Sequence, residues 1–155
     1  LASGRLDDVI LHEMGHVLGL GTNWVLTGFV ADLLTDPAYT GRTGVAAYQE
    51  IGGARYVPLE NDGGLGTVVG HWRESTFGDE LMTGYLGSRP ARMSRLTIAA
   101  LADLGYGVDL GQADPYTLPT QADRSSRLSA PGAQLHTEPL TPFLDGLPSI
   151  LPGTA

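Results

Sequence analysis

The chain has 155 residues, close to the commonest size of one domain, which argues against two full domains. Its formal charge is −8 at pH 7 and all nine basic residues are arginine, so it lacks the basic patch that nucleic acid or an anionic membrane surface requires. The absence of cysteine excludes disulfides and thiolate metal sites, and no apolar run is long enough to predict a membrane span.

Helical periodicity predicts a first helix over about residues 6–18. Two aspartates favour its first turn, Ser3 can cap its start, and Gly19 and Gly21 can end it. The apolar residues that recur at helical spacing are Leu6, Ile10, Met14, Val17 and Leu18.

Further elements are expected along the chain. A short helix is predicted over 43–51, an edge segment over 57–62, and a second long helix from an N-cap at Ser94 to Gly105. Trp24, Tyr48, Trp72 and Phe77 are expected in the core or in a cleft wall. Prolines recur from residue 118 onward among Ser, Thr and Gly, a composition typical of a flexible tail or linker.

The first helix contains the segment His12-Glu13-Met14-Gly15-His16. Histidines four residues apart share one helix face, so both imidazoles can reach one zinc ion at roughly 2.0–2.1 Å. Glu13 projects beside that face, where it can accept a proton from a zinc-bound water. The alternative is a helix whose histidines only cover a packing face.

Gly19, three residues after the second histidine, lets the chain leave the helix sharply, so that a third ligand can return to the metal. In the short form of this motif, found in metzincin peptidases, the third ligand is a histidine three residues further on. Thr22 stands there instead, and it cannot serve as an imidazole ligand. Taken alone, that departure argues against a metzincin.

Two other histidines are available. His136 lies in the proline-rich stretch, where we expect a solvated side chain. His71 is followed eleven residues later by Met82 in a glycine-bearing turn, which is the metzincin order of third ligand and Met-turn. Met82 alone would be read as core filler, but after His71 it is expected to form an apolar floor beneath the imidazoles without binding the metal.

Together these motifs resemble the leishmanolysin family of metzincin zinc endopeptidases. That family carries a long insertion before the third histidine, and here residues 20–70 separate Gly19 from His71. The resemblance covers about residues 5–117. It implies an α+β metzincin fold, represented mainly by the helix with the two histidines and by the C-terminal subdomain with the Met-turn and the helix after it.

The resemblance also implies an activity. One catalytic zinc ion would be held by His12, His16 and His71, with a water at the open position and Glu13 as general base. The reaction would be hydrolysis of peptide bonds in proteins or peptides. Glu60 and Asp62 could line a cleft, bind calcium or be solvated loop carboxylates, and the sequence leaves these choices open.

Two departures from the family shape the expected organisation. The protozoan members are cysteine-rich and lipid-anchored, so this cysteine-free chain looks like a bacterial-type, secreted relative. Metzincins carry a sheet and a helix before the zinc-binding helix, but only 11 residues precede His12. We therefore expect a partial catalytic domain over 1–117 without its N-terminal sheet, cut from a longer reading frame and weak or inactive alone, followed by a tail or linker over 118–155.

Two other classes of function stay open. The first is a catalytically inactive zinc-binding or adhesion module on the same scaffold. The second is a structural domain without metal, which requires three suitably spaced histidines to be accidental. The presence of Glu13 favours the enzyme, because a purely scaffolding site gives this glutamate no structural role.

Overall fold

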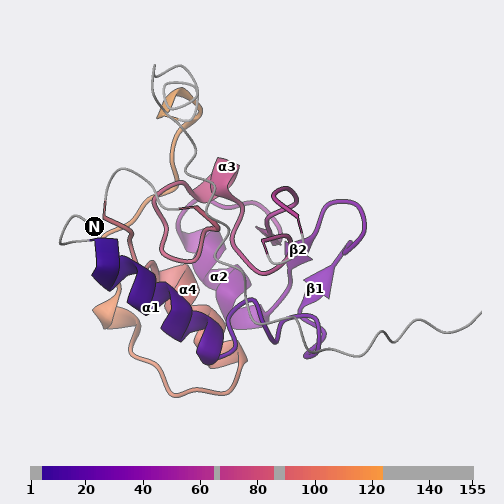
Figure 1. Ribbon diagram of the computed structural model, residues 1–155, viewed down its shortest axis with the longest axis horizontal. Coiled ribbons are helices and arrows are strands. Elements are labelled where there is room, and N and C mark those ends of the chain that lie inside the picture. The colour runs from indigo at the N-terminus through magenta and orange to yellow at the C-terminus, as the bar shows by residue number, and fades with distance from the viewer. Residues whose placement is uncertain (1–4, 65–66, 86–89, 124–155) are drawn as a thin grey trace, which may run out of the picture.

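The computed structural model describes residues 5–64, 67–85 and 90–123 (Figure 1). Its helices are α1 (Arg5–Val17), α2 (Arg42–Glu50), the single turn α3 (Glu74–Phe77), α4 (Arg95–Asp103) and the 3-10 turn η1 (Leu110–Gln112). Three short strands, β1 (Val30–Ala31), β2 (Ala38–Tyr39) and β3 (Val57–Pro58), form an antiparallel sheet in the order β1-β2-β3. The architecture is α+β, as the sequence predicts.

The three predicted helices are confirmed as α1, α2 and α4. Ser94 caps α4 as expected, since its hydroxyl accepts a hydrogen bond from the amide of Thr97. The predicted edge segment begins with β3, which lies at an edge of the sheet, where a proline is tolerated. The capping role expected for Ser3 falls outside the described residues.

The core is built around stacked aromatic side chains. The rings of Trp24 and Trp72 lie 4.4 Å apart, and Tyr39 packs against both at 5.0 and 5.4 Å. Phe77 and Tyr48 extend this cluster, and all five side chains are buried. The prediction that Trp24, Tyr48, Trp72 and Phe77 are core residues is therefore confirmed.

The apolar stripe of α1 does not face this core. Leu6, Ile10, Met14 and Val17 are between 48% and 87% exposed, whereas His12 and His16 on the other side are 1% and 6% exposed. The periodicity thus predicts the helix correctly, but the side turned toward the described core is the one that carries the histidines. None of the described helices is long and apolar enough to cross a membrane.

A narrow ladder continues from β3 and carries the third histidine. Leu59 pairs with Trp72 in an antiparallel bridge, and Trp72 pairs with Thr83 in a parallel one. The amide of Glu60 donates to the carbonyl of His71, and the amide of Trp72 donates to that of Met82, each at 2.9 Å. His71 is therefore fixed between two neighbouring segments of backbone.

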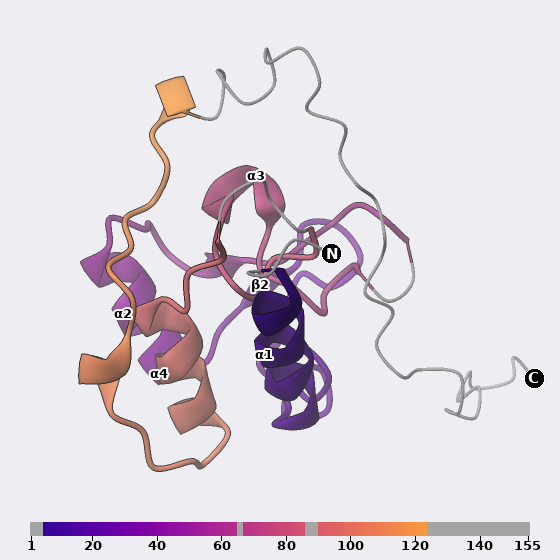
Figure 2. The ribbon, with the colours of Figure 1, turned by 60° about the vertical axis from the view of Figure 1, so that its left-hand side comes forward.

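Helices α2 and α4 lie side by side, behind α1 in the view of Figure 1 and to the left of it in Figure 2. The Asp103 carboxylate, at the end of α4, accepts hydrogen bonds from the amides of Thr43 and Gly44 in the first turn of α2, each at 2.8 Å. It also accepts one from the Tyr39 hydroxyl at 3.0 Å. One carboxylate thus caps α2 from another helix and ties both helices to the sheet.

The end of the chain lies partly outside the described residues. Tyr116 and Leu118 pack against the core, and the described part continues to residue 123. Residues 124–155, which include His136, are not described. The division between a domain at 1–117 and a tail or linker at 118–155 stays a prediction.

Two glycines with nearly the same backbone angle give a matched stability test. Gly21 and Gly28 have φ of +73° and +75°, but a Cβ on Gly21 would collide with the carbonyl of Gly70, whereas nothing lies within 4 Å of one on Gly28. We expect Gly28→Ala to lower the free energy of unfolding by about 1–2 kcal/mol through backbone strain. Gly21→Ala should cost about 1–3 kcal/mol more through the added collision. Urea denaturation followed by tryptophan fluorescence measures both, and equal losses would contradict the close approach of residues 21 and 70.

Candidate metal centre

Three imidazole nitrogens converge between α1 and the ladder. The Nε2 atom of His16 lies 2.9 Å from that of His12 and 3.1 Å from that of His71, and the third separation is 3.2 Å. His12 and His71 are 59 residues apart in the chain. The structure therefore brings together the three histidines that the sequence analysis selected.

The outer nitrogen of each ring points at a backbone carbonyl. Nδ1 of His12 lies 2.7 Å from the Leu81 oxygen, that of His16 lies 2.9 Å from the Leu20 oxygen, and that of His71 lies 3.0 Å from the Thr67 oxygen. A carbonyl can only accept a hydrogen bond, so each Nδ1 carries the proton. In a neutral imidazole the Nε2 atom then holds a lone pair, and all three lone pairs are available to one ion.

The arrangement fits a zinc ion. Three imidazoles bound to zinc at about 2.0–2.1 Å with tetrahedral angles place their nitrogens about 3.3–3.4 Å apart, a few tenths more than the separations here. Three histidines with an open fourth position are a donor set of catalytic zinc sites. Among the described residues, His12, His16 and His71 form a group of three potential ligands that lie close enough together to share one metal ion.

Burial keeps the three rings neutral. It lowers the pKa of His12 to about 4 and that of His71 to about 3, and the nearby His16 contributes to both shifts. The pKa of His16 is also lowered by burial, while its bond to Leu20 and the charge of Glu13 oppose the shift. At neutral pH the site therefore presents uncharged ligands, the form that binds a metal.

Glu13 and Met82 take up positions around the histidines. Glu13 is half-buried, and its carboxylate is near enough to His16 to raise the pKa of that ring. Met82 is fully buried, and a Cβ on Gly15 would lie 2.7 Å from its sulfur. Glycine at position 15, between the two histidines of α1, thus makes room for the Met82 side chain against the helix.

The turn after α1 explains the departure at Thr22. Gly19 adopts a φ of +105°, which ends the helix and brings the Leu20 carbonyl back to His16. The Thr22 hydroxyl donates to the carbonyl of His16 at 2.8 Å. The residue at the short-form ligand position therefore closes the end of the helix, and His71 supplies the third imidazole of the cluster.

Two glutamates, Glu60 and Glu80, are buried, which the sequence analysis did not predict for either. Glu60 is 4% exposed and accepts the amides of Asn61, Asp62 and Glu74, so the solvated-loop alternative is wrong for Glu60, although it fits the exposed Asp62. Glu80 is fully buried two residues before Met82. Burial raises the pKa of Glu80, and donors from Ser94, Thr97 and Met82 oppose that shift. For Glu80, the sequence offers one indication of a role at the site, namely an acidic residue two positions before Met82.

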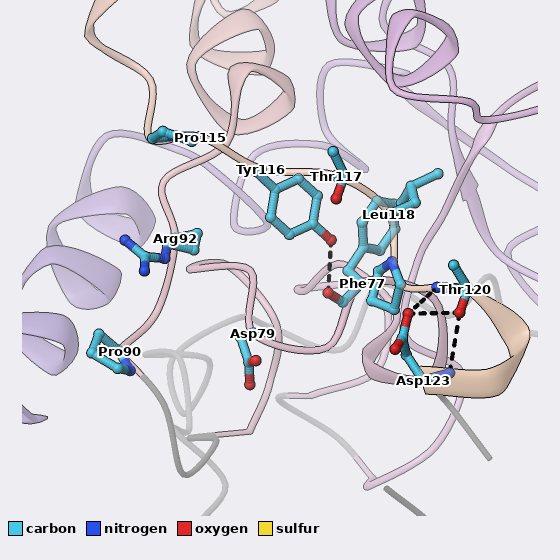
Figure 3. A pocket seen from close by; sticks show the side chains of 11 residues that line it. Phe77, Asp79, Pro90, Arg92, Pro115, Tyr116, Thr117, Leu118, Thr120 and Asp123 are labelled. Atoms are coloured by element: carbon cyan, nitrogen blue, oxygen red, sulfur yellow. Dashed lines mark hydrogen bonds between the residues drawn. The ribbon is translucent and has the colours of Figure 1, made fainter. Parts of the chain in front are cut away.

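A separate pocket of about 470 Å³ lies away from the histidines. It is formed where the segment after α4 crosses the stretch around Phe77 and Arg92, and the Tyr116 hydroxyl donates to the Phe77 carbonyl at its wall (Figure 3). Its described lining includes neither Glu13 nor any of the three clustered histidines. It is therefore not part of the metal centre.

The depressed histidine pKa values predict how stability depends on pH in the metal-free protein. Histidines in the unfolded chain take up protons near pH 6.5, whereas His12 and His71 in the folded protein do so only near pH 4 and 3. Since the unfolded state binds more protons, the free energy of unfolding should be unaffected by these rings above about pH 7 and should fall by several kcal/mol by pH 4. Urea denaturation between pH 8 and 4 in the presence of a chelator measures this. A His71→Asn variant should show a shallower slope, and an identical slope would contradict the assignment.

Comparison with known proteins places the chain in a family. The leishmanolysin family model matches residues 5–122. A leishmanolysin homolog of Crithidia fasciculata is 36% identical over 108 residues, and a leishmanolysin-like peptidase of Caenorhabditis briggsae is 48% identical over 48 residues. These matches cover 63% and 31% of this chain but only 16% and 7% of the two relatives, and no solved structure matches. With most of its residues matched by the family model, the chain belongs to the leishmanolysin family of metallopeptidases.

Proposed function

We propose that the protein is a zinc-dependent endopeptidase of the metzincin type, which hydrolyses peptide bonds of protein or peptide substrates. The observation that carries the proposal is the convergence of three neutral, buried imidazoles whose outer nitrogens are all held by backbone carbonyls. Membership of a family that is zinc-dependent in general supports the choice of metal. The chain covers only a small part of the length of its relatives, so the peptidase activity and the class of substrate are proposed here for this chain.

When bound, zinc supplies a Lewis acid that polarises a peptide carbonyl and makes a water molecule more acidic. The residues of this chain supply the rest. His12, His16 and His71 would hold the metal. Glu13, directly after the first ligand, accepts the proton of the attacking water and returns it to the leaving amine. Glu13 is half-buried and close enough to His16 for its charge to influence the pKa of that ring, which supports this assignment.

The first test is metal content. We expect about one zinc ion per chain after zinc loading, lost on acidification as the imidazoles take up protons. Replacing His71 by alanine should abolish tight binding, because two ligands on one helix leave the site incomplete. The same change at His136 is the control and should leave the zinc content unchanged. Elemental analysis measures both, and a wild-type protein that retains no zinc after incubation with the metal would refute the proposal.

The second test separates an enzyme from a binding module. Glu13→Gln removes the base but keeps its shape and leaves the histidines untouched, so zinc content should stay near normal while hydrolysis falls by at least about 100-fold. Cleavage of casein is measured with and without a chelator, on this chain and on the longest product of the same reading frame. Glu50→Gln, an exposed change at the end of α2, is the matched control and should have no effect.

Three outcomes are informative. Cleavage that a chelator does not inhibit, or equal rates for wild type and Glu13→Gln, would refute the mechanism. A zinc-loaded protein that cleaves nothing across a broad peptide library would instead favour the catalytically inactive module.

A further inference from the structure

The buried carboxylate of Glu80 sits where the Met-turn meets α4. Its Oε1 accepts hydrogen bonds from the hydroxyls of Ser94 and Thr97, each at 2.6 Å, and from the amide of Ser94 at 3.2 Å. Its Oε2 accepts one from the amide of Met82 at 2.6 Å. All four groups are donors, so the site is built for a side chain with two accepting oxygens.

One oxygen connects this carboxylate to the histidines of α1. The bond from the Met82 amide fixes the peptide unit that joins Leu81 to Met82, and the carbonyl of that same unit accepts the Nδ1 proton of His12 at 2.7 Å. Rotation of this peptide would therefore break both contacts together. Glu80 holds the carbonyl that orients His12.

The other oxygen connects to the third histidine. The Thr97 hydroxyl donates to Glu80 and accepts the indole N–H of Trp72 at 2.8 Å. Trp72 directly follows His71, and its amide donates to the Met82 carbonyl at 2.9 Å. The two connections thus form a closed circuit of hydrogen bonds around the Met-turn. His12 is attached to this circuit through the Leu81 carbonyl, and His71 through its chain neighbour Trp72.

We propose that Glu80 is a positioning residue that sets the separation between His71 and the histidines of α1, and thereby the affinity for the metal. The inference rests on the metal site of the proposed function but not on peptide hydrolysis. Partners that orient metal ligands typically contribute 10–100-fold to metal affinity, which gives the scale of the expected effect.

The experiment uses two substitutions that break the circuit at different points. Glu80→Gln turns one accepting oxygen into a donor that must face a donor of Met82 or α4. Thr97→Val keeps the size of the side chain but removes the link to Trp72, and Thr97→Ser keeps the hydroxyl as a conservative rescue. Asp103→Asn is the matched control. Asp103 lies on α4 and its carboxylate also accepts several hydrogen bonds, but the three donors belong to α2 and β2 rather than to the Met-turn.

Zinc affinity is measured by competition with a chromophoric chelator, and ligand geometry by the visible absorption of the cobalt(II) form. We expect Glu80→Gln and Thr97→Val to bind zinc at least about 10-fold more weakly, with altered cobalt spectra. Thr97→Ser should stay within about threefold of wild type. Asp103→Asn should lower the denaturation midpoint without changing zinc affinity or the cobalt spectrum.

The inference is overturned if folded Glu80→Gln and Thr97→Val bind zinc as wild type does, or if Asp103→Asn weakens binding equally. Should Glu80→Gln fail to fold, the comparison of Thr97→Val with Thr97→Ser decides the question alone. A wild-type chain that binds no zinc overturns the proposed function and this inference with it. A wild-type chain that binds zinc without cleaving peptides leaves the inference to be judged on affinity.

Discussion

Three nitrogen lone pairs directed at one point repel one another unless a cation lies among them. In this protein the repulsion cannot be relieved by turning a ring, because each outer nitrogen is engaged with a carbonyl of a different segment. Burial also disfavours relief by protonation, which would place a charge away from water. The rest of the fold therefore holds three rings in an arrangement that a bound cation would stabilise.

The groups that hold the three histidine rings in place are backbone carbonyls rather than side chains. The carbonyls come from the turn after α1, from the stretch before His71 and from the Met-turn. These segments are joined by the ladder of Leu59, Trp72 and Thr83 and by the stacked rings of the core. Peptide groups in such a frame have little freedom to reorient, so the three rings are ordered in advance, and less ordering free energy would oppose the binding of a metal ion.

Much of this could be predicted from the sequence, and the remainder could not for identifiable reasons. Helices α1, α2 and α4 have enough residues for periodicity and capping to act, and the motif spacing selected the three histidines. Strands of two residues show no alternation, so β1 and β2 left no pattern to read. The carbonyl groups that contact the three histidines belong to the backbone, so no particular residue type in the sequence indicates them. The buried roles of Glu60 and Glu80 arise from donors distant in sequence, and charged residues are by default expected at the surface.

The contact between Gly21 and Gly70 bears on how this site tolerates changes in chain length. Gly21 and Gly70 lie at the start and at the end of the segment that separates α1 from His71. Their close approach therefore closes this segment into a loop. The entropy of closing such a loop grows only with the logarithm of its length, so added residues at its exposed bends cost little. Insertions at these bends leave the close approach of Gly21 to Gly70 unchanged, and with it the position of His71 beside α1. The spacing between the second and third histidines is thereby uncoupled from the geometry of the centre that they form.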